Sequence, residues 1–185
     1  MKTRYLTAAI LSWTALAAAQ AQTAPPPAPA AASEAKLDSA DRDFLESAAE
    51  AGQTEIAGSK LALEKARSPD IKAYAQKIID DHGKAGQQLA SLAQSKGYEA
   101  PGEPSLVQKA KLKALGLRDD SFDSAYIDEI GVSAHQDAVK LFTEASNEAK
   151  DPDVRQFAIQ TLPVLQQHLD KATELQQQQA NASKK

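Results

Sequence analysis

The segment PDIKAYAQKIIDDH, residues 69–82, has a close counterpart in PDVRQFAIQTLPVLQQH, residues 152–168. Each follows a residue that caps helices well (Ser68 or Asp151), and each places proline at the first helical position, where no N–H is needed. Apolar side chains then recur at spacings of three and four, the period of one face of an α-helix. A helical pattern that starts near Phe44 or Phe122 precedes each segment. The two segments therefore predict two related helical hairpins.

Outward from these turns, the same spacing predicts four long amphipathic helices. Their approximate limits are residues 38–67, 69–96, 121–149 and 152–176, with a short helix at 105–115. The connection from Gly97 to Asp120 contains the short helix and can run back along a helix of about 42 Å. The sequence thus predicts an all-α, ferritin-like four-helix bundle of two antiparallel hairpins joined by a long crossover.

The two ends of the chain differ in composition from the helical part. Lys2 and Arg4 precede an apolar stretch, residues 5–18, and Ala19-Gln20-Ala21 fits a signal-peptidase site. We expect a signal peptide at 1–21 and a Pro/Ala-rich linker at 22–37, which composition marks as disordered. The bundle domain then covers 38–176, and a polar tail covers 177–185. These features predict a periplasmic or secreted protein without a transmembrane segment in its mature chain.

Composition excludes several kinds of site and partner. The chain has no cysteine, so it cannot form a disulfide, an iron–sulfur cluster or a thiolate zinc site. Its net charge of −4 argues against nucleic-acid binding. The acidic balance also argues against a membrane-surface role, which is typical of a basic amphipathic face.

Polar residues interrupt the apolar face of each long helix near its middle. The chain has only three histidines, one on each of three predicted helices, and a glutamate takes this place on the fourth. These residues are Glu55, His82, His135 and His168. Antiparallel helices of similar length bring their midpoints to one level, so the four side chains should meet in the interior. Imidazole and carboxylate bind zinc, manganese, iron or copper, and the four residues are a candidate site for one divalent metal.

An alternative explains the same pattern without a metal. Buried histidines are often ordinary hydrogen-bonded core residues, and Glu55 can pair with one or two of them. The sequence therefore leaves two hypotheses: a metal- or small-ligand-binding bundle, and a non-catalytic structural or stress-associated interaction protein. It contains no recognisable catalytic constellation, and an enzyme is not expected.

Several motifs resemble those of a known family. They are FLESAAEAGQTE at 44–55, DDH at 80–82, FDSAY at 122–126 and TLPVLQQHL at 161–169. Together they resemble the bacterial domain of unknown function 4142 family, over roughly residues 40–175. The resemblance implies a ferritin-like bundle in a family whose members are often labelled exported or outer-membrane proteins, and it implies no established activity.

The chain departs from the di-iron proteins of the ferritin-like superfamily. Their signature is Glu-x-x-His on two helices. Here the residues three positions before the histidines are Ile79, Val132 and Leu165, and none of these can bind a metal. Di-iron oxidase or iron-storage chemistry is therefore not expected.

Overall fold

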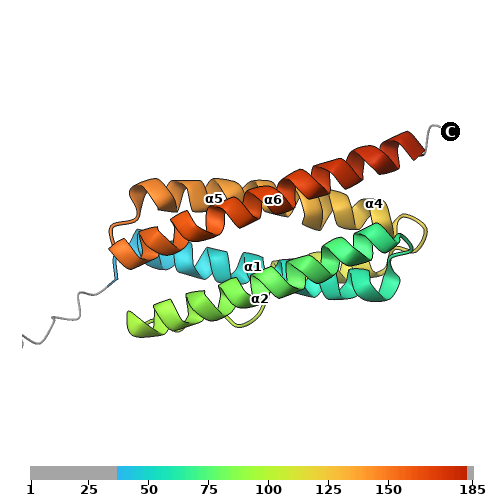
Figure 1. Cartoon of the computed structure of the whole chain (residues 1–185). Coiled ribbons are helices and arrows are strands. Elements are labelled where there is room, and N and C mark those ends of the chain that lie inside the picture. Colours follow the sequence, from blue (N-terminus) through green and yellow to red (C-terminus); the bar gives the residue numbers. More distant parts are fainter. Residues whose placement is uncertain (1–36, 183–185) are drawn as a thin grey trace, which may run out of the picture. The chain divides into compact units, whose positions relative to one another are not determined.

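The computed structural model describes residues 37–182, and this part of the chain is helical and contains no strand. Helices α1 (Ser39–Lys65) and α2 (Pro69–Ser95) form one hairpin. Helices α5 (Ala134–Glu148) and α6 (Pro152–Ala182) form the other (Figure 1). The predicted caps are present, because the Ser68 hydroxyl accepts from the N–H of Ile71 and the Asp151 carboxylate accepts from those of Asp153 and Val154. The predicted all-α fold with two hairpins is confirmed.

The hairpins are joined by the long crossover that the sequence predicts. It contains α3 (Leu106–Gly116), which begins with a capping box between Ser105 and Gln108. At one end of the bundle, Lys96 after α2 pairs with Asp151 before α6. At the other end, Arg67 after α1 pairs with Asp120, just before the second hairpin. The chain therefore travels the length of the bundle between the hairpins.

The second half of the crossover leads into a helix that is less regular than predicted. In place of one α-helix from about Ser121, α4 (Phe122–Tyr126) continues into a π-helical segment, η1 (Ile127–Ser133), and then into α5. A π-turn holds more residues than an α-turn, so it shifts which side chains face inward. Ile127, Ile130 and Gly131 are buried, whereas Asp128 is exposed and Val132 is only half-buried. In a regular α-helix Asp128, seven residues before His135, would share the inner face with it, and the π-helical segment is the reason that it does not.

The apolar core consists of two clusters at different levels of the bundle. One contains Tyr74, Ile78, Phe122, Tyr126 and Ile130. The other contains Phe44, Leu89, Phe142, Phe157 and Leu165. On each of the four long helical segments, a buried glutamate or histidine lies between the residues of the first cluster and those of the second. The core is therefore divided by a polar layer.

The chain ends lie largely outside the described residues. This applies to the expected signal peptide, nearly all of the expected linker, and the last three residues. Helix α6 continues to Ala182, beyond the expected end near Gln176. No helix within 37–182 has the length and apolar character that crossing a bilayer requires.

Candidate metal centre

The polar layer is built from the four residues that the sequence singled out. Glu55 comes from α1, His82 from α2, His135 from the start of α5 and His168 from α6. Each side chain is at least 94% shielded from solvent, since the exposed fractions are 1, 6, 0 and 2%. The centres of the three imidazole rings form a nearly equilateral triangle with sides of 5.3, 5.4 and 5.4 Å. The structure therefore brings all four residues together.

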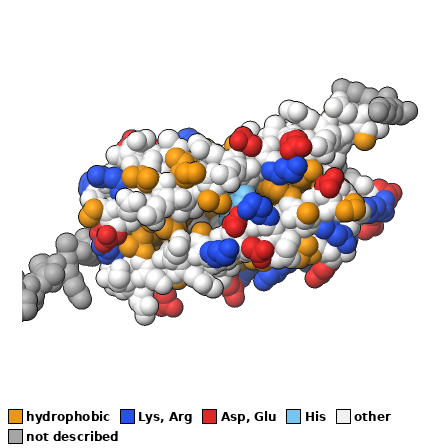
Figure 2. All heavy atoms as spheres, in the orientation of Figure 1, with side chains coloured by type: hydrophobic (Ala, Val, Ile, Leu, Met, Phe, Trp, Pro, Cys, Tyr) orange, Lys and Arg blue, Asp and Glu red, His pale blue; other side chains and the backbone are white. Residues whose placement is uncertain are grey.

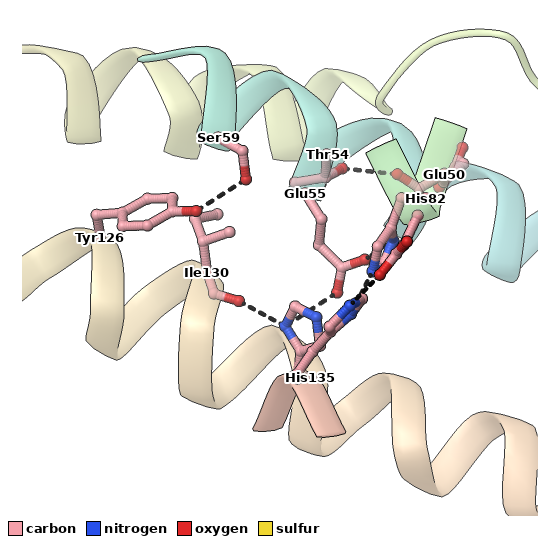
Figure 3. A network of polar contacts seen from close by, with 10 residues as sticks. Glu50, Thr54, Glu55, Ser59, His82, Tyr126, Ile130 and His135 are labelled. Carbon is pink, nitrogen blue, oxygen red and sulfur yellow. Dashed lines mark hydrogen bonds and ion pairs between the residues drawn. The ribbon is translucent and has the colours of Figure 1, made fainter. Parts of the chain in front are cut away.

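One nitrogen of each imidazole is held by an oxygen on the outer side of the triangle. Glu55 Oε2 lies 2.8 Å from His82 Nδ1. The Ile130 carbonyl lies 2.9 Å from His135 Nδ1, and Asp81 Oδ2 lies 2.9 Å from His168 Nε2. Figure 3 shows Glu55 and His82 meeting, with His135 between Glu55 and the Ile130 carbonyl. In neutral imidazole, a nitrogen that donates to such an oxygen leaves the other nitrogen with a free lone pair.

The remaining nitrogens belong to the interior of the triangle. His82 Nε2 and His168 Nδ1 lie 3.3 Å apart, so one of the two rings must supply a proton for them to be hydrogen-bonded. His135 Nε2 is buried and has no hydrogen-bond partner among the described residues. Glu55 Oε1 is also without one, at 3.7 Å from His135 Nδ1. Buried polar atoms are nearly always satisfied, so both atoms call for a ligand or a water.

The π-helical segment explains how His135 is held. In an α-helix the Ile130 carbonyl would accept from the N–H four residues later. The wider turn of η1 alters that pattern and leaves this carbonyl facing the imidazole of His135, five residues on. The close packing of η1 on α6 also requires Gly131, because a Cβ there would lie 3.0 Å from the Cβ of Ala172. Single π-turns inside α-helices frequently mark functional sites.

Asp81 is the site residue that sequence reasoning missed. The sequence favours a surface role for both Asp80 and Asp81. Asp80 has that role, since it is exposed and accepts a hydrogen bond from the Gln76 amide on the helix exterior. Asp81 bridges His168 and Lys77, and its side chain is only 21% exposed. Asp81 is one position from His82 and so points about 100° away around α2, which is why the apolar stripe does not indicate it.

The surroundings of the three histidines shift their pKa values in different directions. Burial favours neutral imidazole, and it lowers the pKa of His135 below the usual value and that of His168 to about 4. Burial acts in the same direction on His82, but the adjacent Glu55 carboxylate outweighs it and raises the pKa of His82. Burial by itself raises the pKa of Glu55, but the neighbouring imidazoles, His82 first, lower it more. In the metal-free layer these shifts favour a charged His82 opposite the Glu55 carboxylate, beside neutral imidazoles at His135 and His168.

These pKa directions predict how the stability of the metal-free protein depends on pH. Because the folded pKa of His168 (about 4) is below its unfolded value, the unfolded state binds protons first as the pH falls from 6.5 to about 4. Stability should therefore decrease across that window by roughly 3 kcal/mol for His168, at about 1.4 kcal/mol per pKa unit. His135 acts in the same direction. His82 has the opposite effect. Its contribution to the free energy of unfolding is fully present below pH 6.5 and is lost as the pH rises through its raised pKa.

Urea unfolding in EDTA between pH 4.5 and 9 measures this dependence. The expected result is a maximum near the ordinary histidine pKa of about 6.5, with a decline on both sides. His168→Gln serves as the comparison, because it should flatten the acid side and leave the alkaline side unchanged. Equal stability at pH 4.5 and 6.5 in the wild type would show that His168 is not held neutral.

A cavity of about 130 Å³ lies beside the layer. Its walls are mostly Ala, Gly, Leu and Phe side chains, and they include the crossover residues Ala100, Pro101 and Gly102. Glu55, Asp81 and His82 also line it. Figure 2 shows a small area of histidine on the visible face, beside acidic and basic side chains. The layer is therefore buried but lies close to the surface.

The triangle has the dimensions of a three-imidazole metal site. A metal about 2.0–2.1 Å from an imidazole nitrogen is about 3.2 Å from the ring centre, so three bound rings have centres about 5.2–5.5 Å apart. One nitrogen from each ring lies within 4.8 Å of the other two. Two ligand nitrogens of a tetrahedral site are about 3.4 Å apart, close to the 3.3 Å between His82 and His168.

Comparisons with known proteins support the fold. A solved structure described as CopM in the Cu(I)-bound form aligns with a TM-score of 0.65 and 22% identity, over 75% of this chain and 96% of that one. A DUF305 fragment from Deinococcus radiodurans aligns with a TM-score of 0.66 and 15% identity, over 77% and 98%. At these identities the likeness shows the fold alone. No curated relative of the chain was found. Residues 26–175 match the family described as Domain of unknown function (DUF4142), and the chain belongs to that family.

Proposed function

We propose that this protein binds one transition-metal ion through His82, His135 and His168. The observation that carries the proposal is the way in which the two nitrogens of each imidazole are engaged. Each has one nitrogen held by an outer oxygen, and the other remains for the shared interior, where His135 Nε2 has no hydrogen-bond partner within residues 37–182. Metal-binding histidines are typically held in this way by a carboxylate or a backbone carbonyl.

Glu55 has a different role in this proposal from the one expected on sequence grounds. The sequence suggests Glu55 as a fourth ligand. Its two oxygens lie on the outer Nδ1 atoms of His82 and His135, at 2.8 and 3.7 Å. We therefore assign to Glu55 the role of orienting His82 and balancing the charge of the bound ion, with Asp81 doing the same at His168.

The donor set favours zinc, copper or iron over manganese. Imidazole suits Zn, Cu and Fe, whereas Mn²⁺ favours oxygen ligands, and a nitrogen site generally binds Cu²⁺ more tightly than Fe²⁺. CopM is described as bound to Cu(I). This chain lacks the sulfur ligands that Cu(I) favours, since it has no cysteine and its single methionine is Met1. Titrations with Zn²⁺, Cu²⁺ and Cu(I) in parallel decide among them.

The proposal is tested by titrating the full chain, purified without added histidines and stripped with EDTA. We expect one equivalent of Zn²⁺ or Cu²⁺ to bind and to raise the free energy of unfolding by about 2.7 kcal/mol at a hundredfold excess over Kd. Binding should release about one proton, because the His82 proton lies between two nitrogens that would become ligands. Calorimetry in buffers of different ionisation enthalpy measures that proton.

The structural alternative predicts a different result from the same experiment. It is favoured by one observation, the direct contact between His82 and His168. If the layer only stabilises the core, then none of the three metals should change the unfolding curve. That outcome would overturn the metal proposal.

We further propose that the protein acts outside the cytoplasm, as its N-terminal sequence suggests. The positive charges at Lys2 and Arg4, the apolar stretch at 5–18 and the small residues Ala19 and Ala21 support export with cleavage after Ala21. Intact mass measurement of the periplasmic or secreted protein should find Gln22 at the N-terminus. A mass that includes Met1 would contradict this proposal.

A further inference from the structure

Helix α3 has two apolar faces, and the bundle covers only one of them. Leu112 and Leu115 are buried against the rest of the domain. On the opposite side Leu106, Val107 and Leu117 are 84, 67 and 76% exposed. Only one other large hydrophobic side chain within 37–182 is comparably exposed, Ile159 on α6 at 46%. Exposed apolar side chains that gather in one place mark an interaction site.

The exposed apolar face of α3 is bordered by positive charge on both sides. At 100° per residue, the stripe runs through Leu106, Leu117, Ala110, Ala114 and Val107 within about 100° of the helix circumference. Lys109 and Lys113 border one side of the stripe and Lys111 borders the other, while Arg118 follows the end of the helix. No acidic residue occurs between Leu106 and Arg118, although the whole chain has a net charge of −4. We call the exposed side chains of Leu106, Val107 and Leu117, with the adjacent Lys109, Lys111 and Lys113, the basic apolar face.

Part of this charge is not neutralised by the protein itself. Lys109 pairs with Glu103, and Arg118 pairs with Glu129. Lys111 and Lys113 are exposed and make no ion pair within the described part of the chain. The capping box stabilises the start of α3, and the buried Leu112 and Leu115 hold one side of the helix against the domain. The opposite side therefore faces solvent along the length of the helix. A surface that meets this face must accept apolar side chains in its centre and supply negative charge around them.

We propose that the basic apolar face docks α3 onto an anionic lipid bilayer, lying in the plane of the interface. Leu106, Val107 and Leu117 would enter the acyl boundary while the lysines contact anionic headgroups, as interfacial amphipathic helices do. The net charge of the chain argues against a membrane-surface role when the sequence is considered as a whole. The local charge of α3 has the opposite sign, and only the local surface meets the bilayer. The proposal is independent of the metal centre.

The test is co-sedimentation of the full chain with vesicles in EDTA. The vesicles contain phosphatidylcholine alone, or phosphatidylcholine with about a third phosphatidylglycerol, at low and at 0.5 M salt. We expect binding to the anionic vesicles that weakens at high salt, because salt screens the lysine–headgroup attraction. Leu106→Ser with Leu117→Ser should reduce the binding constant at least tenfold, and so should Lys111→Ala with Lys113→Ala.

Two matched variants control for general changes of hydrophobicity and charge. Ile159→Ser removes an exposed apolar side chain from α6, and Lys60→Ala with Lys140→Ala removes two exposed charges elsewhere. Both should bind like the wild type, and thermal melting should show that all variants remain folded. All variants keep the apolar stretch at 5–18, so a difference between them reports on α3. Absence of binding to anionic vesicles, or equal binding by all variants, overturns the proposal and leaves an acidic protein surface as the partner of this face.

Discussion

His135→Ala is expected to abolish the response of the protein to zinc or copper. His135 supplies a buried ring nitrogen to which no described residue is hydrogen-bonded, and its loss leaves two imidazoles at the centre. The wild type should gain about 2.7 kcal/mol at a hundredfold excess of metal over Kd. That gain corresponds to a rise in Tm of about 5–11 °C for a domain of this size. The variant should gain less than about 1 °C under the same conditions, measured by thermal melting with and without metal.

The behaviour of His135→Ala without metal separates the two hypotheses further. The substitution removes the hydrogen bond to the Ile130 carbonyl and leaves a cavity, so the metal-free variant should be less stable by about 1–3 kcal/mol in either case. Asp137→Ala, at an exposed position on the same helix, should match the wild type in both assays. A full metal response in His135→Ala would exclude the three-histidine site.

Glu55→Gln is expected to destabilise the metal-free protein by about 3 kcal/mol at pH 7, because it breaks a buried ion pair and keeps the shape of the side chain. The amide can still accept from His82 Nδ1, but it no longer favours the charged imidazole. Neutral His82 then presents the lone pair of Nε2 to His168 Nδ1, whose ring donates from Nε2 to Asp81. Two acceptors would face each other at this contact, and its hydrogen bond would be lost. Urea unfolding in EDTA measures the difference.

Two further measurements show whether Glu55 acts through His82. By NMR titration the pKa of His82 should lie above the usual value in the wild type and fall in Glu55→Gln, since the carboxylate is the main group that raises it. The affinity for zinc should also fall about 10- to 100-fold, as for other residues that orient a ligand. Glu64→Gln, exposed on the same helix, should change stability by less than about 0.5 kcal/mol. An unchanged His82 pKa in Glu55→Gln would show that the ion pair does not exist.

Local sequence signals determine most of the fold. Serine or aspartate before proline begins α2 and α6, and apolar side chains at helical spacing form the inner faces. The length of the segment between Gly97 and Asp120 is enough to predict a crossover. The positions of Glu55 and the three histidines near the helix midpoints are also enough to predict that they meet, since antiparallel helices of similar length align their centres. These features depend on one helix, or on the lengths of connections, and both can be read from the chain.

Contacts between helices decide the rest. The composition of residues 127–133 does not indicate a π-helix. The extra residue in that turn depends on the close packing of η1 against α6 at Gly131, and this contact involves a helix that is distant in the sequence. Asp81 joins the layer only because α6 brings His168 to the side of α2, away from the apolar stripe. Whether Glu55 would bind a metal or orient His82 depends on which nitrogens of the imidazoles its oxygens approach, and only the packed structure gives this. The composition gives only the net charge of the whole chain. The packing of Leu112 and Leu115 decides which side chains of α3 face solvent, and so decides the local charge of that surface. Periodicity locates side chains around one helix axis, and only tertiary packing determines which atoms of different helices meet.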